Sequence, residues 1–279
     1  MVYATEAGVA ARTRFSRHTA EGALIWRSEY FGPPPSPPGT TSVDPGAPRG
    51  PAYADPAPGE VRPPQAFLVE QEPGAIVHPH FHFVDQFQVV VDGGGTIGKH
   101  AVRAVSAHFA AAHTGYGPIR AGTSGLKYFS LRASADSTGA QYLPGARDRM
   151  RAGPRRNVFA DPVVPSSEDA LRRLAGPAVA TALEAEDGLA IHVLRIPPGG
   201  TLAAPEPAAG GGQSFLVIAG TVLRDGAALG LWSALFAAAD EPACLFRAGP
   251  GGAEVLALRY PRPAPMCDSP GMANGTADS

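Results

Sequence analysis

Histidines are concentrated in one part of this chain of 279 residues, since six of its eight histidines lie between residues 78 and 113. The densest stretch, from His78 to Gly95, reads HPHFHFVDQFQVVVDGGG. Neutral imidazole is the commonest metal ligand in proteins, so the stretch raises the possibility of a metal site. The alternative is a histidine-rich strand whose buried rings are held by backbone carbonyl groups.

Two of these histidines, His80 and His82, are separated by one residue. Residues i and i+2 of a β-strand point to the same face, so the two imidazoles could bind one ion together. A further ligand would come from a neighbouring strand. A second frame uses His78, His80 and Asp85, which also have a spacing of histidines and acid that suits a metal.

The wider spacing around the pair is Gly74, five residues, His80-x-His82, three residues, Gln86, six residues and Gly93. It resembles the first motif of the cupin superfamily, with glutamine in place of the usual glutamate. The resemblance implies a double-stranded β-helix barrel, with Gln86 as a third metal ligand. The structural alternative for Gln86 is a hydrogen bond to the opposite strand.

The second cupin motif is incomplete in this sequence. It normally supplies a histidine three residues after a Pro-x-Gly turn, and here the turn-like segment ends at Gly122 and Gly125 occupies the histidine position. The usual fourth ligand is therefore missing. His108, in the strand-like run VSAHFAA, is our choice for the replacement, and His113 in the following glycine-rich loop is the other candidate.

An internal repeat indicates that the barrel has been duplicated. The segment AHFAAAHTGYGPIRAGTSGLKYFSLR, from Ala107, matches ALFAAADEPACLFRAGPGGAEVLALR, from Ala234, at an offset of 127 (234 minus 107) without a gap. The same offset places Gln86 on Gln213. His80 and His82 correspond to Pro207 and Ala209, and His108 and His113 correspond to Leu235 and Asp240, so we expect the second unit to hold no metal.

We therefore predict an all-β bicupin, with two double-stranded β-helix barrels in tandem and a short helix, SSEDALRRLAG, in the linker. Ser166 would cap this helix and Gly176 would end it. Proline and glycine dominate residues 32–65 and deny both helix and central strand. The predicted units are a lead-in over 1–65, a first barrel over 66–135, a linker over 136–188, a degenerate second barrel over 189–263 and a flexible tail over 264–279.

Four further residues of the first repeat are candidates for the site. Tyr116 lies in a glycine-rich loop from which a phenol could reach the barrel mouth, and packing is the alternative. Lys127 shares strand parity with Phe129 and points inward if the cupin register holds. Phe87 and Phe129, with the other aromatic side chains of this repeat, would accommodate an aromatic or moderately apolar substrate.

The predicted function is metal-dependent catalysis on a small, oxygen-rich or aromatic molecule. Neutral ligands leave the full charge of a divalent ion at the site, which makes it a strong Lewis acid. We expect Fe(II) and a dioxygenase, with Zn, Mn or Ni as other metals. The alternatives are a Zn-dependent lyase, isomerase or cyclase, and a non-catalytic small-molecule-binding bicupin.

The composition narrows the partners to small molecules or other proteins. The net charge of −2 lacks the basic excess of a general nucleic-acid binder, and no run of about 18 apolar residues predicts a membrane-spanning helix. Only two cysteines are present, without CxxC spacing, and no signal peptide is recognised, so we expect a cytoplasmic protein. A homodimer is compatible with the sequence.

Overall fold

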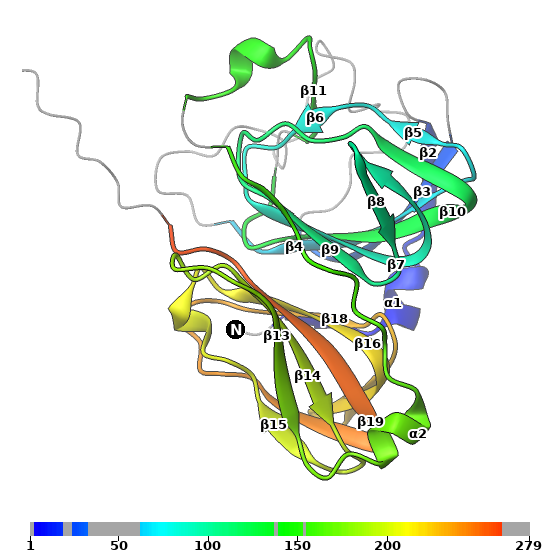
Figure 1. The fold of residues 1–279 in the computed structure, drawn as a ribbon, viewed down its shortest axis with the longest axis vertical. Coiled ribbons are helices and arrows are strands. Elements are labelled where there is room, and N and C mark those ends of the chain that lie inside the picture. Colours follow the sequence, from blue (N-terminus) through cyan, green and yellow to red (C-terminus); the bar gives the residue numbers. More distant parts are fainter. Residues whose placement is uncertain (1–2, 19–23, 33–61, 137–138, 153–154, 264–279) are drawn as a thin grey trace, which may run out of the picture.

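The computed structural model describes residues 3–18, 24–32, 62–136, 139–152 and 155–263. Its strands form two barrels that lie one above the other, with the short helix α1 beside the junction (Figure 1). This confirms the predicted all-β architecture of two tandem barrels. Of the proline- and glycine-rich segment predicted over 32–65, residues 33–61 lie outside the described residues, as does the predicted flexible tail over 264–279. In the described part of the chain, no helix has the length and apolar character needed to span a membrane.

The first barrel is built around a nine-stranded antiparallel sheet with the main order β12-β9-β7-β10-β4-β3-β2. β5 pairs with β10, β8 pairs with β7, and the short strands β6 and β11 form a separate pair above the sheet. The strands are β2 (Phe15–His18), β3 (Leu24–Phe31), β4 (Gln65–Gln71), β5 (Ile76–Val77), β6 (His80–Phe81), β7 (Gln86–Ile97), β8 (His100–Arg103), β9 (Ser106–Ala110), β10 (Ile119–Arg132), β11 (Gln141–Tyr142) and β12 (Asn157–Phe159).

The second barrel is an eight-stranded sheet with the main order β1-β18-β16-β19-β14-β13, to which β15 and β17 add at β19 and β16. Its first strand comes from the N-terminal end of the chain, because Tyr3 pairs with Phe236. The strands are β1 (Tyr3–Thr5), β13 (Ala178–Glu184), β14 (Ala190–Ile196), β15 (Thr201–Ala203), β16 (Gln213–Arg224), β17 (Ala227–Leu229), β18 (Ala234–Ala237) and β19 (Leu245–Arg259).

The observed boundaries correct the predicted ones. Strands β2 and β3 extend the sheet of the first barrel, so this barrel does not begin at residue 66. Strand β12 pairs with β9, and β13 pairs with β14, so much of the predicted linker belongs to one barrel or the other. The apolar alternation in these short segments was too weak to separate them from loop, and pairing with a longer neighbour stabilises them.

The described helical segments are short. The predicted linker helix is α2 (Glu168–Arg172), and its cap is Ser167, whose Oγ accepts from the Ala170 amide at 3.2 Å, one residue after the predicted cap. It ends before Gly176 because Leu171 is the one side chain it buries. The other helical segments are α1 (Ala7–Ala11) and the 3₁₀ turns η2 (Arg147–Arg149) and η3 (Pro207–Ala209).

One apolar core joins the two barrels. It takes Phe87, Phe109 and Phe129 from the first barrel and Leu256 and Tyr260 from the second, all of them buried. The ring centroids of Phe87 and Tyr260 are 5.1 Å apart. A second apolar cluster fills the inside of the second barrel, and a third lies inside the first. Because the shared core is apolar, separation of the barrels would expose it to water.

The repeat offset preserves a close backbone contact in each barrel. Gly93 and Gly220 both adopt positive φ, 69° and 66°. A Cβ atom added to Gly93 would lie 2.2 Å from the carbonyl oxygen of Gly125, and one added to Gly220 would lie 2.1 Å from that of Gly252. Only glycine allows the two long strands to approach so closely where they bend.

Candidate active site

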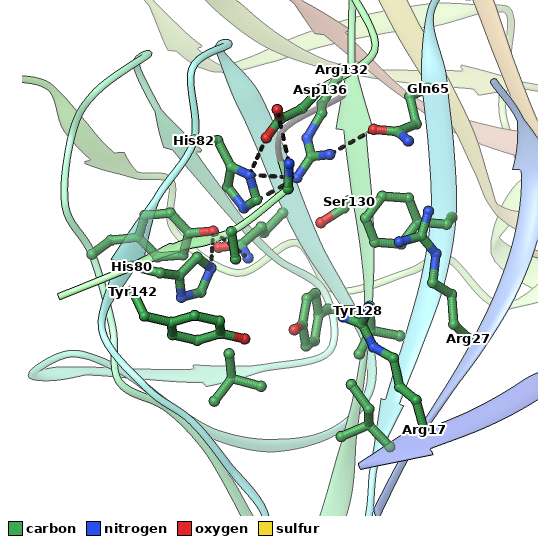
Figure 2. A pocket seen from close by; sticks show the side chains of 18 of the residues that line it. Arg17, Arg27, Gln65, His80, His82, Tyr128, Ser130, Arg132, Asp136 and Tyr142 are labelled. Atoms are coloured by element: carbon green, nitrogen blue, oxygen red, sulfur yellow. Dashed lines mark hydrogen bonds and ion pairs between the residues drawn. The ribbon is translucent and has the colours of Figure 1, made fainter. Parts of the chain in front are cut away.

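The candidate site is a small cavity of about 90 Å³ inside the first barrel, lined on one side by β10 and on the other by β6 and β11. His80 and Tyr142 are adjacent to one another on the β6–β11 side (Figure 2). Tyr128, Ser130 and Arg132 alternate along β10 and face the cavity. Alternate residues of a strand share a face, so one strand supplies two hydroxyl groups and a guanidinium group.

His80 has its tautomer fixed by a backbone acceptor. The ring is 4% exposed, and its Nδ1 lies 2.7 Å from the carbonyl oxygen of His78. A carbonyl oxygen can only accept, so Nδ1 carries the hydrogen and Nε2 keeps its lone pair. The hydroxyl group of Tyr116 lies 2.7 Å from Nε2 and donates to it.

His82 is held in the same way by a carboxylate. Its Nδ1 lies 2.5 Å from Oδ2 of Asp136, which again leaves the lone pair on Nε2. Burial lowers the pKa of His80 to about 3 and that of His82 to about 4, and the neighbouring positive charge of Arg132 acts in the same direction on His82. Both rings are therefore neutral at pH 7, which is the form that can bind a metal.

Arg132 is the buried cation of the site. Its Nη1 donates to Oε1 of Gln65 at 2.6 Å and its Nη2 donates to Oε1 of Gln86 at 3.0 Å. Nη2 also lies 3.2 Å from Nε2 of His82. Oε1 of Gln86 and Nε2 of His82, which are two of the expected ligand atoms, are therefore hydrogen-bond acceptors for a guanidinium group in this structure.

Some solved structures resemble this chain in fold. No family model and no curated protein matches the sequence. Among solved structures, a provisional dioxygenase from Nostoc punctiforme has a TM-score of 0.54 at 8% identity and covers 92% of this chain and 78% of its own. A provisional glyoxylate-induced protein from Pseudomonas aeruginosa has a TM-score of 0.52 at 14% identity, covering 92% and 86%. YhhW from Escherichia coli has a TM-score of 0.50 at 14% identity, covering 94% and 98%.

These matches extend across both barrels, whose strands repeat at the offset found in the sequence. The chain has a bicupin fold. At these identities the likeness concerns the fold alone, and the chemistry of this chain has to be argued from its own side chains.

The bicupin fold brings together only part of the predicted metal site. His80 and His82 are adjacent, with ring centroids 5.3 Å apart, and both have a lone pair on Nε2. Gln86 lies next to them, but its amide bridges Arg132 and Tyr116. Within the described part of the chain, no three His, Cys, Asp or Glu side chains are grouped as a metal site. The two imidazoles fit a metal, and the other predicted ligands are not arranged around them.

His108 is not in the cavity. Its Nδ1 lies 2.9 Å from Oε1 of Gln88, and its Nε2 lies 3.1 Å from Oδ1 of Asn157. Its ring is stacked on Phe159 at 4.3 Å between centroids. Because both ring nitrogens are engaged by side-chain amides, the assignment of His108 as a metal ligand is corrected to a buried structural role.

The other candidate histidine ligands are also directed elsewhere. The ring of His113 is stacked on Phe83 at 4.8 Å between centroids, outside the cavity. His78 is exposed and contributes its carbonyl oxygen to His80. Oδ1 of Asp85 accepts from the amide of Ala112 at 2.7 Å and thereby holds a loop. The second frame, with His78, His80 and Asp85, is therefore not assembled.

Lys127, Phe87 and Phe129 need correction as site residues. Lys127 and Phe129 do share one face of β10, but Tyr128, Ser130 and Arg132 occupy the face that lines the cavity. The side chain of Lys127 is 34% exposed, and its Nζ lies 3.0 Å from Oδ2 of Asp92. Phe87 and Phe129 belong to the core between the barrels. The inward face of the strand had been assigned one residue out of phase.

Tyr116 lines the cavity, which its loop position allowed its phenol to reach. Its hydroxyl group contacts His80, Gln86 and, at 3.4 Å, Nε2 of Gln88. Burial raises its pKa, so the phenol stays protonated at neutral pH. Arg132 was missed, although the repeat aligns it with Arg259 and so marked it. Asp136 follows the end of β10 and carried no sequence signal.

Proposed function

We propose that the first barrel is the active site of a metal-dependent enzyme, in which Nε2 of His80 and Nε2 of His82 bind a divalent ion. The observation that carries the proposal is the fixed tautomer of both rings. The backbone of His78 and the carboxylate of Asp136 each hold an Nδ1–H group. Metal-binding histidines commonly have such a partner, because it orients the ring and raises its basicity.

Further oxygen atoms beside these rings are Oη of Tyr116 and Oε1 of Gln86, which already make hydrogen bonds in the site. A divalent ion with neutral ligands would supply Lewis acidity and open coordination positions, and Fe(II) would also supply reactivity toward dioxygen. We favour Fe(II) and a dioxygenase. Zn(II) with a lyase, isomerase or cyclase reaction is the alternative for the same ligands.

Side chains around the two histidines would set the hydrogen bonds and the charge balance of the pocket. Tyr116, whose pKa is raised by burial, can donate a hydrogen bond from its position beside His80. Asp136 balances the charge of Arg132 in a dry site, where an isolated buried charge would be costly. Tyr116, Asp136 and Arg132 thus make the pocket polar, while the two proposed metal ligands are neutral imidazoles.

A metal-free, small-molecule-binding bicupin is the second candidate, and Arg132 favours it. The guanidinium group donates to Oε1 of Gln86 and lies beside Nε2 of His82, so a cation already interacts with the atoms that a metal would need. In the second barrel, Gln213 and Arg259 face each other across the strands, so a pair of the same residue types occurs where the imidazoles are absent.

Metal content decides between the two candidates. The chain is purified without added metal, and metals are measured before and after incubation with Fe(II), Mn(II), Ni(II) or Zn(II). We expect close to one equivalent in the wild type and less than about a tenth of that in the His80→Ala/His82→Ala double variant, because ligand loss abolishes tight binding. The exposed His100 provides a matched control, His100→Ala, which should keep its metal.

A folded wild type that takes up none of the four metals and gains no stability from them would overturn the metal proposal in favour of the binding protein. Equal metal in the wild type and the double variant would remove His80 and His82 from the site. Oxygen uptake by the Fe(II)-loaded protein in the presence of substrate would separate the dioxygenase from the zinc alternative.

A further inference from the structure

We propose that the outer edge of β13, which faces away from β14, is a dimerisation surface where a second copy of this chain adds its own β13 in antiparallel pairing. β13 ends the strand order of the second sheet, and β14 is the one strand of the described chain with which it pairs. A strand at the end of a sheet presents backbone amide and carbonyl groups with which a further strand can pair.

The first barrel shows how such an edge can be completed. By their pairing partners, β4 and β14 are equivalent in the two sheets, and so are their neighbours β3 and β13. In the first sheet, β2 pairs with β3 from Phe15 to His18. In the described part of the second sheet, no strand takes the place of β2. The barrel architecture therefore allows one more strand beside β13.

β13 lacks the features that protect the other ends of the two sheets. β12 and β1 have three residues each, and β2 has four and carries Arg17 and His18. β13 has seven residues and carries no charge before Glu184. Its first five residues are all exposed, and because neighbouring residues of a strand point to opposite faces, both faces are open. Short length and charged side chains commonly prevent strand addition, and neither protects β13.

The sequence of β13 suits pairing with an identical strand. Its first five residues read AVATA, which is nearly the same in both directions because valine and threonine have similar branched shapes. In an antiparallel pair centred on Ala180, Val179 faces Thr181 of the second copy and alanine faces alanine. The ladder with β14 is regular over Ala178–Thr181, so this part of β13 keeps the alternation of backbone groups that a partner strand needs.

The charges at the two ends of β13 favour the antiparallel arrangement. Arg173 precedes the strand, Glu184 ends it and Glu186 follows it, and all three residues are exposed. An antiparallel second copy brings the arginine end of each strand toward the glutamate end of the other. A parallel copy would bring like charges together, which is unfavourable. Antiparallel pairing of identical strands is also two-fold symmetric, so the interface closes at two copies.

The C-terminal segment of the same chain is the other candidate for this edge. It leaves the described residues near the end of β13, because the amide of Arg262 donates to the carbonyl oxygen of Asp187 at 2.8 Å. Its sequence over 264–279 contains Pro265, Pro270 and two glycines. Proline cannot donate to a ladder and glycine weakens a strand, so β13 of a second copy is the better partner.

Sedimentation velocity on the full chain tests the proposal. We expect the wild type to form a dimer with a dissociation constant of about 10 µM or lower. Val179→Lys, at a position that is 47% exposed, would place two like charges near the two-fold axis and should weaken self-association at least about 10-fold. Val164→Lys, at a position 73% exposed and outside the strands and helices, is the matched control and should associate as the wild type does. Circular dichroism checks that both variants are folded.

Disulfide trapping locates the interface in a Cys267→Ser background, in which the other cysteine, Cys244, is buried. Ala180→Cys should give a covalent dimer on mild oxidation, because facing residues of antiparallel strands have Cα atoms about 5 Å apart, within reach of a disulfide. Ala228→Cys, at an exposed alanine of β17 in the same barrel, is the control and should stay uncrosslinked.

Two results would overturn the proposal. The first is a wild type that stays monomeric at about 100 µM, whether the C-terminal segment or nothing covers β13. The second is a dimer that is unaffected by Val179→Lys in the folded protein and gives no cross-link through Ala180→Cys, since its interface would then lie elsewhere. Both results leave the metal proposal for the first barrel untouched, because β13 belongs to the second barrel.

Discussion

At equivalent positions of their last long strands, the first barrel carries Tyr128 and Ser130 and the second carries Val255 and Ala257. The glycine contacts at the bends and the facing glutamine and arginine occur in both. The polar interior of the first barrel thus depends on a few side chains placed in a backbone that also accommodates an apolar interior. The residues that both barrels share build the barrel, whereas the polar residues found only in the first barrel form its cavity.

The glycine contacts should produce the largest effect, and it should be equal in the two barrels. Gly93→Ala and Gly220→Ala each place a Cβ atom about 2 Å from a carbonyl oxygen in a left-handed conformation. We expect each variant to lose about 3 kcal/mol or more of unfolding free energy, measured by chemical denaturation. Gly230→Ala, where an added Cβ meets no atom within 4 Å, should be close to the wild type. A large loss at only one of the two sites would break the comparison.

Acid should lower the unfolding free energy through buried histidines of the first barrel. Burial lowers the pKa of His108 from its ordinary value of 6.5 to about 4, so the unfolded chain binds more protons than the folded one between these values. Stability is therefore full above about pH 6.5 and falls toward pH 4, by up to about 1.4 kcal/mol per pH unit for this residue. Denaturation of the metal-free protein at several pH values measures the slope. It should be smaller in His108→Leu; an equal slope in this variant would contradict the assignment.

The same His108→Leu substitution tests the role of this residue at neutral pH. Leucine is the residue of the second barrel at this position, but here it would leave Oε1 of the buried Gln88 without its partner. We expect a loss of about 1–3 kcal/mol in unfolding free energy, because a buried polar atom becomes unsatisfied. The metal content per folded chain should not change. A lower metal content without loss of stability would restore His108 as a ligand.

The smallest effect is expected at Lys127, which lies on the face of β10 away from the cavity. Its half-exposed ion pair with Asp92 is worth about 0–1 kcal/mol. Lys127→Ala should therefore melt within a few degrees of the wild type and keep its metal content unchanged. A loss of binding in this folded variant would show that the inward face of β10 had been assigned incorrectly.

The two-barrel fold could be predicted from the sequence because the duplication shows the same backbone requirements twice. The ungapped offset from Ala107 to Ala234 and the glycines at 93 and 220 report backbone geometry directly. The short strands β12 and β13 were not accessible, since their pairing depends on neighbours rather than on a strong pattern of their own. The boundary of α2 could not be predicted to the residue either, since its cap is Ser167 and the predicted cap was Ser166.

The candidate site could be predicted from the sequence only where residues close together on one strand form it. The spacing of His80 and His82 predicted a shared face, and the two rings are adjacent. The phase of β10 was assigned incorrectly because both of its faces are apolar enough to be buried, one in the core shared by the barrels and one in the cavity wall. Asp136 reaches His82 across 54 positions of sequence, a contact that no local pattern encodes.

The crossing of β1 into the second barrel has a consequence for the order of events during synthesis. Tyr3 pairs with Phe236, a separation of 233 positions (236 minus 3), whereas β2 and β3 lie in the sheet of the first barrel. The first barrel can pair its own strands as soon as residue 159 has been made, but β1 has no strand with which to pair until β18 emerges. The edge of the second sheet is thus completed by a segment that is made before the strands of the first barrel, and this long-range pairing forms late.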